Sequence, residues 1–162
     1  MSQINSWDDI IKKYGGFKGV FDYFRNNKKE MIDLLNKFFI GIEPVYQYIK
    51  ARVVDYGEGF SKIEFPASKD IMRWGGIVNG GVIMTVIDLA IGLAVMTVNN
   101  GYNQYTAELK VNFLQPLKEG PFTSIGRVIR KGRTLVVGEA EVFDSRNVLC
   151  AKGIGTWFIL TS

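Results

Sequence analysis

The chain has 162 residues, 47% of them hydrophobic, which suits one well-packed domain and is short for two. Its formal net charge of +4 is too small to indicate nucleic-acid binding by itself. The absence of histidine and the presence of one cysteine, Cys150, exclude Ser-His-Asp and Cys-His catalysis, an ordinary zinc site and an intramolecular disulfide.

Residues 1–44 are predicted to form a helical extension. A first helix is expected over Trp7 to Tyr14, where the preceding serine is a candidate N-cap, and a second from about Lys18 to Asn26. Gly41 and Pro44 are expected to end a third helix. Its apolar residues recur at helical spacing: Met31, Leu34, Leu35, Phe38 and Phe39.

Residues 45–162 are predicted to form an α+β domain. A long apolar helix is expected over Gly80 to Val98. Strands are expected at 51–56, 60–65, 109–113, 122–130, 134–143 and 148–160. Runs of strands around one helix indicate an antiparallel sheet. Because the helix is apolar on nearly all sides, we expect a curved sheet to wrap around it.

The apolar segment has about the length of a membrane span, and that interpretation is rejected. Asp88 lies near its centre and would cost on the order of 3 kcal/mol on insertion into a bilayer. No lysine or arginine cluster flanks the segment. The first residues also lack the charged and apolar regions of a signal peptide. We therefore expect a core helix in a cytoplasmic protein that does not contact a membrane.

Asp88 needs a partner, because a lone buried carboxylate is costly. It shares one helix face with small and polar residues at i, i+4, i+7 and i+11: Gly81, Thr85 and Gly92. Two interpretations stay open: a close-packing groove, or a stripe that faces a ligand. At the helix start, Gly80 and Gly81 leave room for a ligand, and their N–H groups suit a developing oxyanion. The alternative is a tight loop-to-helix junction.

The segment GGIVNGGV at 75–82, followed by Asp88, resembles the motif of hotdog-fold acyl-CoA thioesterases of the phenylacetate-pathway (PaaI-like) type. Those proteins have G-x-x-H-G-G-V and an aspartate some eight or nine positions after the histidine. Further matches are TAELKVNFLQP at 106–116, the turn RKGR at 130–133 and AKGIGT at 151–156. The resemblance covers about residues 45–160 and implies the hotdog fold, an antiparallel sheet wrapped around one helix.

The resemblance also implies an activity, the hydrolysis of an acyl-CoA thioester at two equivalent sites in a dimer that often assembles into a tetramer. It implies that Asp88 is the general base or nucleophile, that Thr106 supports it, and that the Gly80 amide, with Gly81 behind it, polarises the thioester carbonyl. Coenzyme A enters as part of the substrate, and no separate cofactor or metal is implied. The candidates for binding its phosphates lie in a turn whose alternative is a solvated hairpin tip: Arg130, Lys131 and Arg133.

Two positions depart from the family motif. Asn79 stands in place of the usual histidine, and Arg73 in place of an asparagine that is often found. Asn79 can still donate a hydrogen bond through its amide, and Arg73 and Thr85 are candidate substrate-binding residues. A second function therefore stays open, a hotdog protein that binds acyl-CoA without efficient catalysis. A hydratase is disfavoured because those enzymes generally use histidine.

The spacing within the apolar helix predicts a dimer. Gly81 and Asp88 are seven residues apart, roughly 10 Å along the helix axis, whereas a base must lie within about 3 Å of the proton it takes. An aspartate from an antiparallel partner helix would reach a thioester bound at the helix start more easily. The acyl group is not specified by the sequence, although Trp74, Met84 and the N-terminal phenylalanines are candidate pocket residues as well as candidate core residues.

Overall fold

The computed structural model describes residues 6–161, so residues 1–5 of the predicted extension and residue 162 of the predicted domain lie outside the described part of the chain. The described chain begins with helices α1 (Trp7–Tyr14), α2 (Phe17–Tyr23), α3 (Lys28–Phe38) and α4 (Pro44–Ile49). A short 3-10 helix at Ile40–Ile42 lies between the last two.

The first three helices were predicted, although the bounds of α2 differ, and the helical structure after residue 38 was not predicted. Helix α1 has its predicted bounds because the Ser6 hydroxyl oxygen accepts a hydrogen bond from the Asp9 N–H at 3.1 Å. Helix α2 ends at Tyr23, before the predicted Asn26. Helix α3 ends at Phe38, before Gly41 and Pro44 as predicted, but helix α4 was not predicted. Pro44 lies in the first turn of α4, where its missing N–H is not needed.

An antiparallel sheet follows, with the strand order β1-β2-β6-β7-β8-β5. Its strands are β1 (Arg52–Gly57), β2 (Phe60–Phe65), β5 (Asn103–Phe113), β6 (Phe122–Lys131), β7 (Leu135–Phe143) and β8 (Leu149–Leu160). The short strands β3 (Met72–Arg73) and β4 (Ile77–Val78) pair separately, in the segment that leads to the apolar helix.

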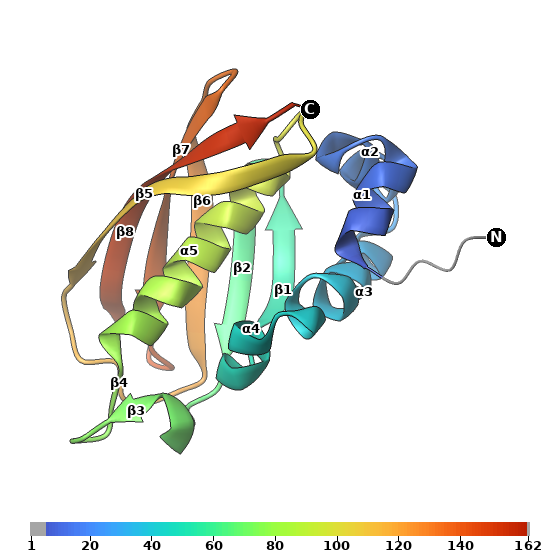
Figure 1. Ribbon diagram of the computed structural model, residues 1–162. Coiled ribbons are helices and arrows are strands. Elements are labelled where there is room, and N and C mark those ends of the chain that lie inside the picture. The colour runs from blue at the N-terminus through green and yellow to red at the C-terminus, as the bar shows by residue number, and fades with distance from the viewer. Residues whose placement is uncertain (1–5, 162) are drawn as a thin grey trace.

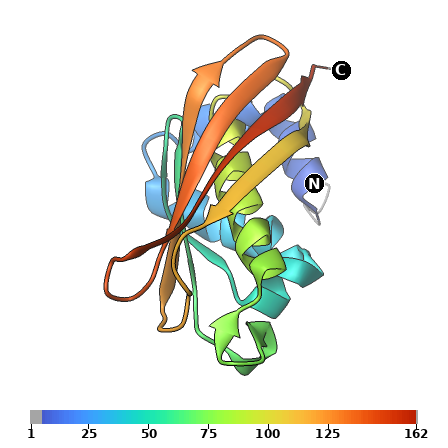
Figure 2. The same cartoon turned by 90° about the vertical axis from the view of Figure 1, so that its left-hand side faces the viewer.

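The apolar helix is α5 (Gly80–Met96), and it lies in the hollow of the curved sheet (Figures 1 and 2). Two buried hydroxyl groups join helix and sheet: Ser61 Oγ donates to the Ala90 carbonyl oxygen at 2.6 Å, and Ser124 Oγ donates to that of Val86 at 3.3 Å. A Cβ at Gly126 would lie 2.2 Å from the Ala90 oxygen, so the contact needs glycine in β6. Within residues 6–161, no helix is both long enough and apolar enough to cross a membrane.

The two edge strands of the sheet, β1 and β5, differ in whether other parts of the chain cover them. At β1, the Asn36 side chain of α3 pairs with the backbone of Val53, accepting from its N–H at 2.8 Å and donating to its carbonyl oxygen at 2.9 Å. The N-terminal helices lie beside this edge (Figure 1). At the other edge, β5 pairs with β8 alone among the described strands. Its Tyr105 and Phe113 side chains are 57% and 53% exposed.

Candidate active site

Asp88 lies midway along α5 and is partly buried. Thr106, on β5, donates a hydrogen bond from Oγ1 to Asp88 Oδ1 at 2.8 Å. Burial raises the pKa of the Asp88 carboxyl above its ordinary value, and the hydrogen bond from Thr106 opposes that shift. The structure thus brings together the two side chains that the family resemblance paired. The described residues offer no hydrogen-bond donor to Asp88 Oδ2.

Asn79 caps the N-terminus of α5. Its side-chain oxygen Oδ1 accepts a hydrogen bond from the Gly81 N–H at 2.8 Å, as expected of an N-cap residue. The Gly81 N–H is therefore engaged within the chain, which leaves the Gly80 N–H as the remaining candidate of the two glycines predicted to contact an oxyanion. No acceptor among residues 6–161 bonds to the Gly80 N–H. Thr85 is also engaged within the helix, donating from Oγ1 to the Gly81 carbonyl oxygen at 2.9 Å.

Arg73 lies near Gly80 and away from Asp88. Arg73, Gly80 and Phe113 line one surface pocket of about 350 Å³, and Asp88 does not line it. The Arg73 guanidinium donates to the carbonyl oxygen of Trp74 at 3.2 Å. The indole of Trp74 itself is 93% exposed, so the expectation that it lines an acyl pocket is wrong for the single chain.

The basic hairpin is remote from the start of α5 within one chain. Arg130, Lys131 and Arg133 are exposed around the β6–β7 turn. Lys131 borders a hollow together with Val98 and Asn100, which follow the last turn of α5. The helix of residues 80–96 separates this end from Gly80 by roughly 25 Å. A single chain therefore does not bring the candidate phosphate-binding residues to the candidate oxyanion site.

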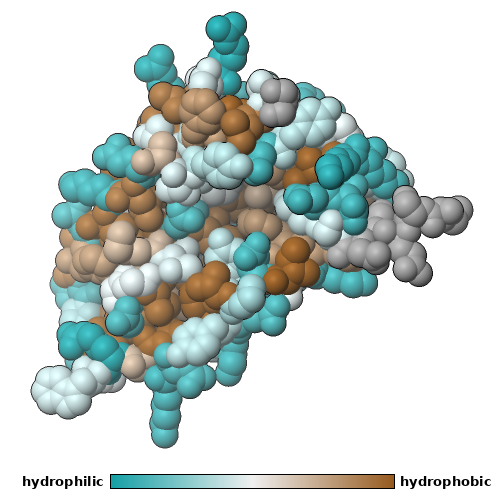
Figure 3. Space-filling view, viewed as in Figure 1, coloured by the Kyte–Doolittle hydropathy of each residue, from teal (hydrophilic) through white to brown (hydrophobic). Residues whose placement is uncertain are grey.

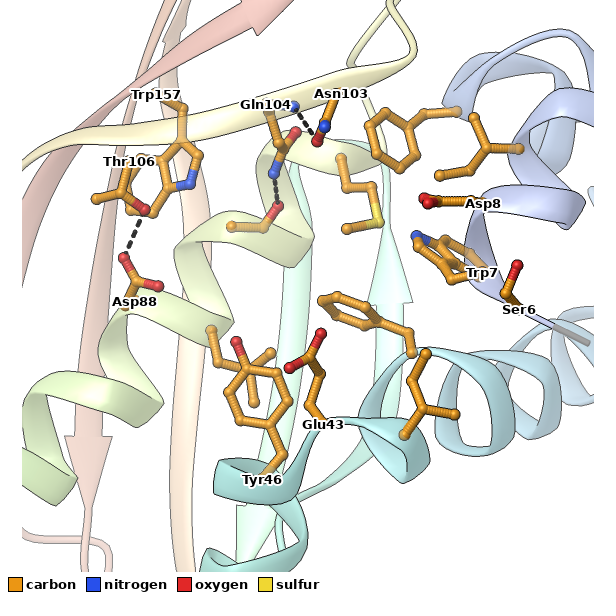
Figure 4. A pocket seen from close by; sticks show the side chains of 17 residues that line it. Ser6, Trp7, Asp8, Glu43, Tyr46, Asp88, Asn103, Gln104, Thr106 and Trp157 are labelled. Atoms are coloured by element: carbon orange, nitrogen blue, oxygen red, sulfur yellow. Dashed lines mark hydrogen bonds between the residues drawn. The ribbon is translucent and has the colours of Figure 1, made fainter.

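Asp88 and Thr106 line a pocket of about 370 Å³ between α5 and the N-terminal helices (Figure 4). The face seen in Figure 3 is hollowed in this region, with apolar side chains around the hollow. Phe17 and Phe39 line the pocket, as expected of the N-terminal phenylalanines, and Met84 does not. The other lining residues are Ser6, Trp7, Asp8, Ile11, Ile42, Glu43, Tyr46, Leu89, Gly92, Met96, Asn103, Gln104 and Trp157.

Tyr46 lines this pocket, which the sequence did not indicate. It comes from α4, and its hydroxyl group points into the pocket (Figure 4). Burial, and then the negative charges of Asp88 and Glu43, raise the pKa of Tyr46 to about 12, so the phenol stays neutral near pH 7. Gln104 was also missed; its amide donates to the Gly92 carbonyl oxygen at 2.7 Å. The aromatic content of the N-terminal helices was the only sequence signal for Tyr46. It does not indicate which face of each helix packs against α5.

Comparison with known proteins gives concordant matches. Residues 75–151 match the model of the thioesterase superfamily. A protein of Saccharolobus solfataricus, whose name describes it provisionally as an esterase, is 39% identical over 132 residues, covering 82% of this chain and 94% of the relative. A thioesterase family protein from Silicibacter pomeroyi superposes with a TM-score of 0.72 at 25% identity, covering 80% of this chain and 95% of that one. A Streptococcus mutans protein bound to acetyl CoA superposes with a TM-score of 0.63 at 24% identity, covering 68% and 88%.

Proposed function

Because this chain belongs to the thioesterase superfamily and has its hotdog fold, we propose that it hydrolyses an acyl-CoA thioester to the free acid and coenzyme A. The observation that carries the proposal is Asp88, a partly buried carboxylate with a raised pKa, held by Thr106 at the wall of a pocket. A carboxyl group of this kind suits general-base chemistry. Coenzyme A as the thiol component is supported by the acetyl CoA in the S. mutans structure.

In the proposed reaction, Asp88 takes a proton from water while the water oxygen attacks the thioester carbon. Negative charge develops on the carbonyl oxygen, where the unengaged N–H of Gly80, at the positive end of the helix dipole, stabilises it. Collapse of the tetrahedral intermediate breaks the C–S bond. The departing coenzyme A thiolate takes up the proton that Asp88 accepted, which restores the carboxylate.

The two groups must come from two chains in this proposal. Gly80 and Asp88 are eight residues apart, roughly 12 Å along the axis of α5. The unpaired edge of β5, with Tyr105 and Phe113 exposed, is suited to pairing with a second copy. Antiparallel α5 helices would place the Asp88 of one chain near the Gly80 of the other. The basic hairpin, at the far end of α5, would then lie beside the partner's helix start, where coenzyme A would bind.

A second candidate, a protein that binds acyl-CoA without cleaving it, is favoured by one observation. The Asn79 side-chain oxygen is used to cap the Gly81 N–H, so this residue is held as part of the helix start. The cap fixes the orientation of the side-chain amide NH₂. An amide also cannot accept and release protons as the usual imidazole can. The second candidate would keep the pocket and the coenzyme A contacts and lose turnover.

Release of free thiol from short, long and aromatic acyl-CoAs by the purified protein tests the proposal. Asp88→Asn is expected to lower kcat/KM by about a hundredfold to ten-thousandfold, the usual contribution of a general base, while keeping the wild-type unfolding temperature within a few degrees. Hydrolysis that survives in Asp88→Asn would show the mechanism to be wrong. An acyl-CoA that raises the unfolding temperature and is never cleaved would favour the binding protein.

A further inference from the structure

The end of the pocket remote from Asp88 is built by the N-terminal helices (Figure 4). Four aromatic side chains contact one another in series from this end of the pocket back toward Asp88, and they form the aromatic wall of the pocket. The ring centroids of Phe17 and Trp7 are 6.4 Å apart, those of Trp7 and Phe39 are 5.8 Å apart, and those of Phe39 and Tyr46 are 6.0 Å apart. Such a wall is fixed by its own packing, so it presents a preformed surface to whatever occupies the pocket.

Trp7 has an unsatisfied hydrogen-bond donor in this wall. Its side chain is 7% exposed, and its Nε1 is the one buried side-chain polar atom of the described residues that has no hydrogen-bond partner. The indole nitrogen lies at the end of the ring that points into the pocket (Figure 4). A buried donor without an acceptor is energetically unfavourable, so an acceptor supplied by a ligand would gain affinity from this hydrogen bond.

The charges near Trp7 restrict what that acceptor can be. The carboxylates of Asp8 and Glu43 line the pocket, and no lysine or arginine of the described chain lines it. An anionic group would be repelled there and would have no counter-ion. A neutral hydroxyl group fits, because its oxygen can accept from Trp7 Nε1 and its proton can be donated to a carboxylate.

We propose that the pocket takes an acyl group with a hydroxyl oxygen at its distal end, and that Trp7 Nε1 recognises this oxygen. The proposal rests on the thioesterase function, because it places the thioester carbon beside Asp88 and the rest of the acyl chain along the pocket toward Trp7. The N-terminal helices are then the part of the chain that selects the substrate.

Binding of S-alkyl-CoA thioethers tests the proposal without requiring turnover. A series of increasing chain length is prepared in plain, ω-hydroxy and ω-carboxy forms, and each affinity is measured by titration calorimetry. At the length that reaches Trp7, the ω-hydroxy form is expected to bind about tenfold more tightly than the plain form, a gain of about 1.4 kcal/mol. The ω-carboxy form is expected to bind more weakly than the plain form.

Three variants test which groups set these preferences. Trp7→Phe keeps an aromatic ring and removes the donor, so the ratio of ω-hydroxy to plain affinity is expected to fall to about one. Ile10→Val, on the same helix and fully buried outside the pocket lining, is the matched control and is expected to keep the wild-type ratio. Glu43→Gln, at an exposed position, is expected to weaken the discrimination against the ω-carboxy form, and it serves if Trp7→Phe does not fold.

Equal affinity of the plain and ω-hydroxy forms at every length, or a preference that persists in Trp7→Phe, would overturn the proposal. The same wild-type protein is assayed for thiol release in parallel. A preference without hydrolysis rejects the thioesterase function and supports the recognition by Trp7. Hydrolysis without any preference supports the thioesterase function and rejects the recognition by Trp7. The failure of one proposal can therefore be distinguished from the failure of the other.

Discussion

Two opposing effects act on the pKa of Asp88, and a substitution at Thr106 removes one of them. Burial destabilises its charged form, and the hydroxyl group of Thr106 stabilises it. A general base must be ionised, so activity is lost as the pH falls through the pKa of Asp88. The acidic limb of the pH profile of kcat/KM is therefore expected above the ordinary aspartate value of 3.8.

Thr106→Val keeps the shape of the side chain and removes the donor. Since the hydrogen bond lowers the pKa of Asp88, its loss is expected to move the acidic limb to higher pH. Thr106→Ser, which keeps a hydroxyl group, is expected to restore the wild-type position. The check is kcat/KM across pH for the three proteins, and an acidic limb that stays in place in Thr106→Val would show that this hydrogen bond does not control the base.

Helix α5 approaches the sheet more closely than a side chain at Gly126 would allow. Gly126→Ala would place a methyl carbon 2.2 Å from the Ala90 carbonyl oxygen, beside the Ser61 hydroxyl. Overpacking of this kind is expected to lower the free energy of unfolding by about 1–3 kcal/mol in denaturant titration. Gly57→Ala is the control, because its Cβ would meet the Phe60 side chain at an ordinary 3.8 Å. Equal stability of the two variants would contradict this packing.

Elements with a local signal were predictable, and elements set by docking were not. Helix α1 was predicted at its true bounds because Ser6 marks its start. Asp88 was identified as a candidate site residue because it is the single charged residue of the apolar helix. Helix α4 was missed because six residues show little periodicity and Pro44 signals both an end and a beginning. Trp7 and Tyr46 line the pocket only because of the way the N-terminal helices pack beside α5, which depends on tertiary contacts.

At the scale of the whole molecule, one sheet edge is closed and the other is open. Asn36 occupies the backbone groups of Val53 at the β1 edge, whereas β5 has no second strand beside it among the described residues. An open edge of this length favours association with another chain. Together with the separation of Gly80 and Asp88 along α5, the open edge supports our proposal that each complete site takes one group from each of two chains.

Mixing two inactive variants tests that arrangement most directly. Gly80→Pro removes the N–H proposed for the oxyanion, yet proline suits the first helical position, and the extended Asn79 backbone before it (φ −58°, ψ 135°) accepts a following proline. Gly80→Ala keeps the N–H and is expected to lose less activity. Asp88→Asn supplies the second inactive chain.

If the sites are shared, a mixed dimer of Gly80→Pro and Asp88→Asn has one intact site and one doubly defective site. Thiol release measured after the two proteins are unfolded together and refolded in equal amounts is then expected to recover to about a quarter of the wild-type rate, because half the dimers are mixed and each has one working site. A mixture that stays as inactive as its components would contradict a site built from Asp88 of one chain and Gly80 of the other.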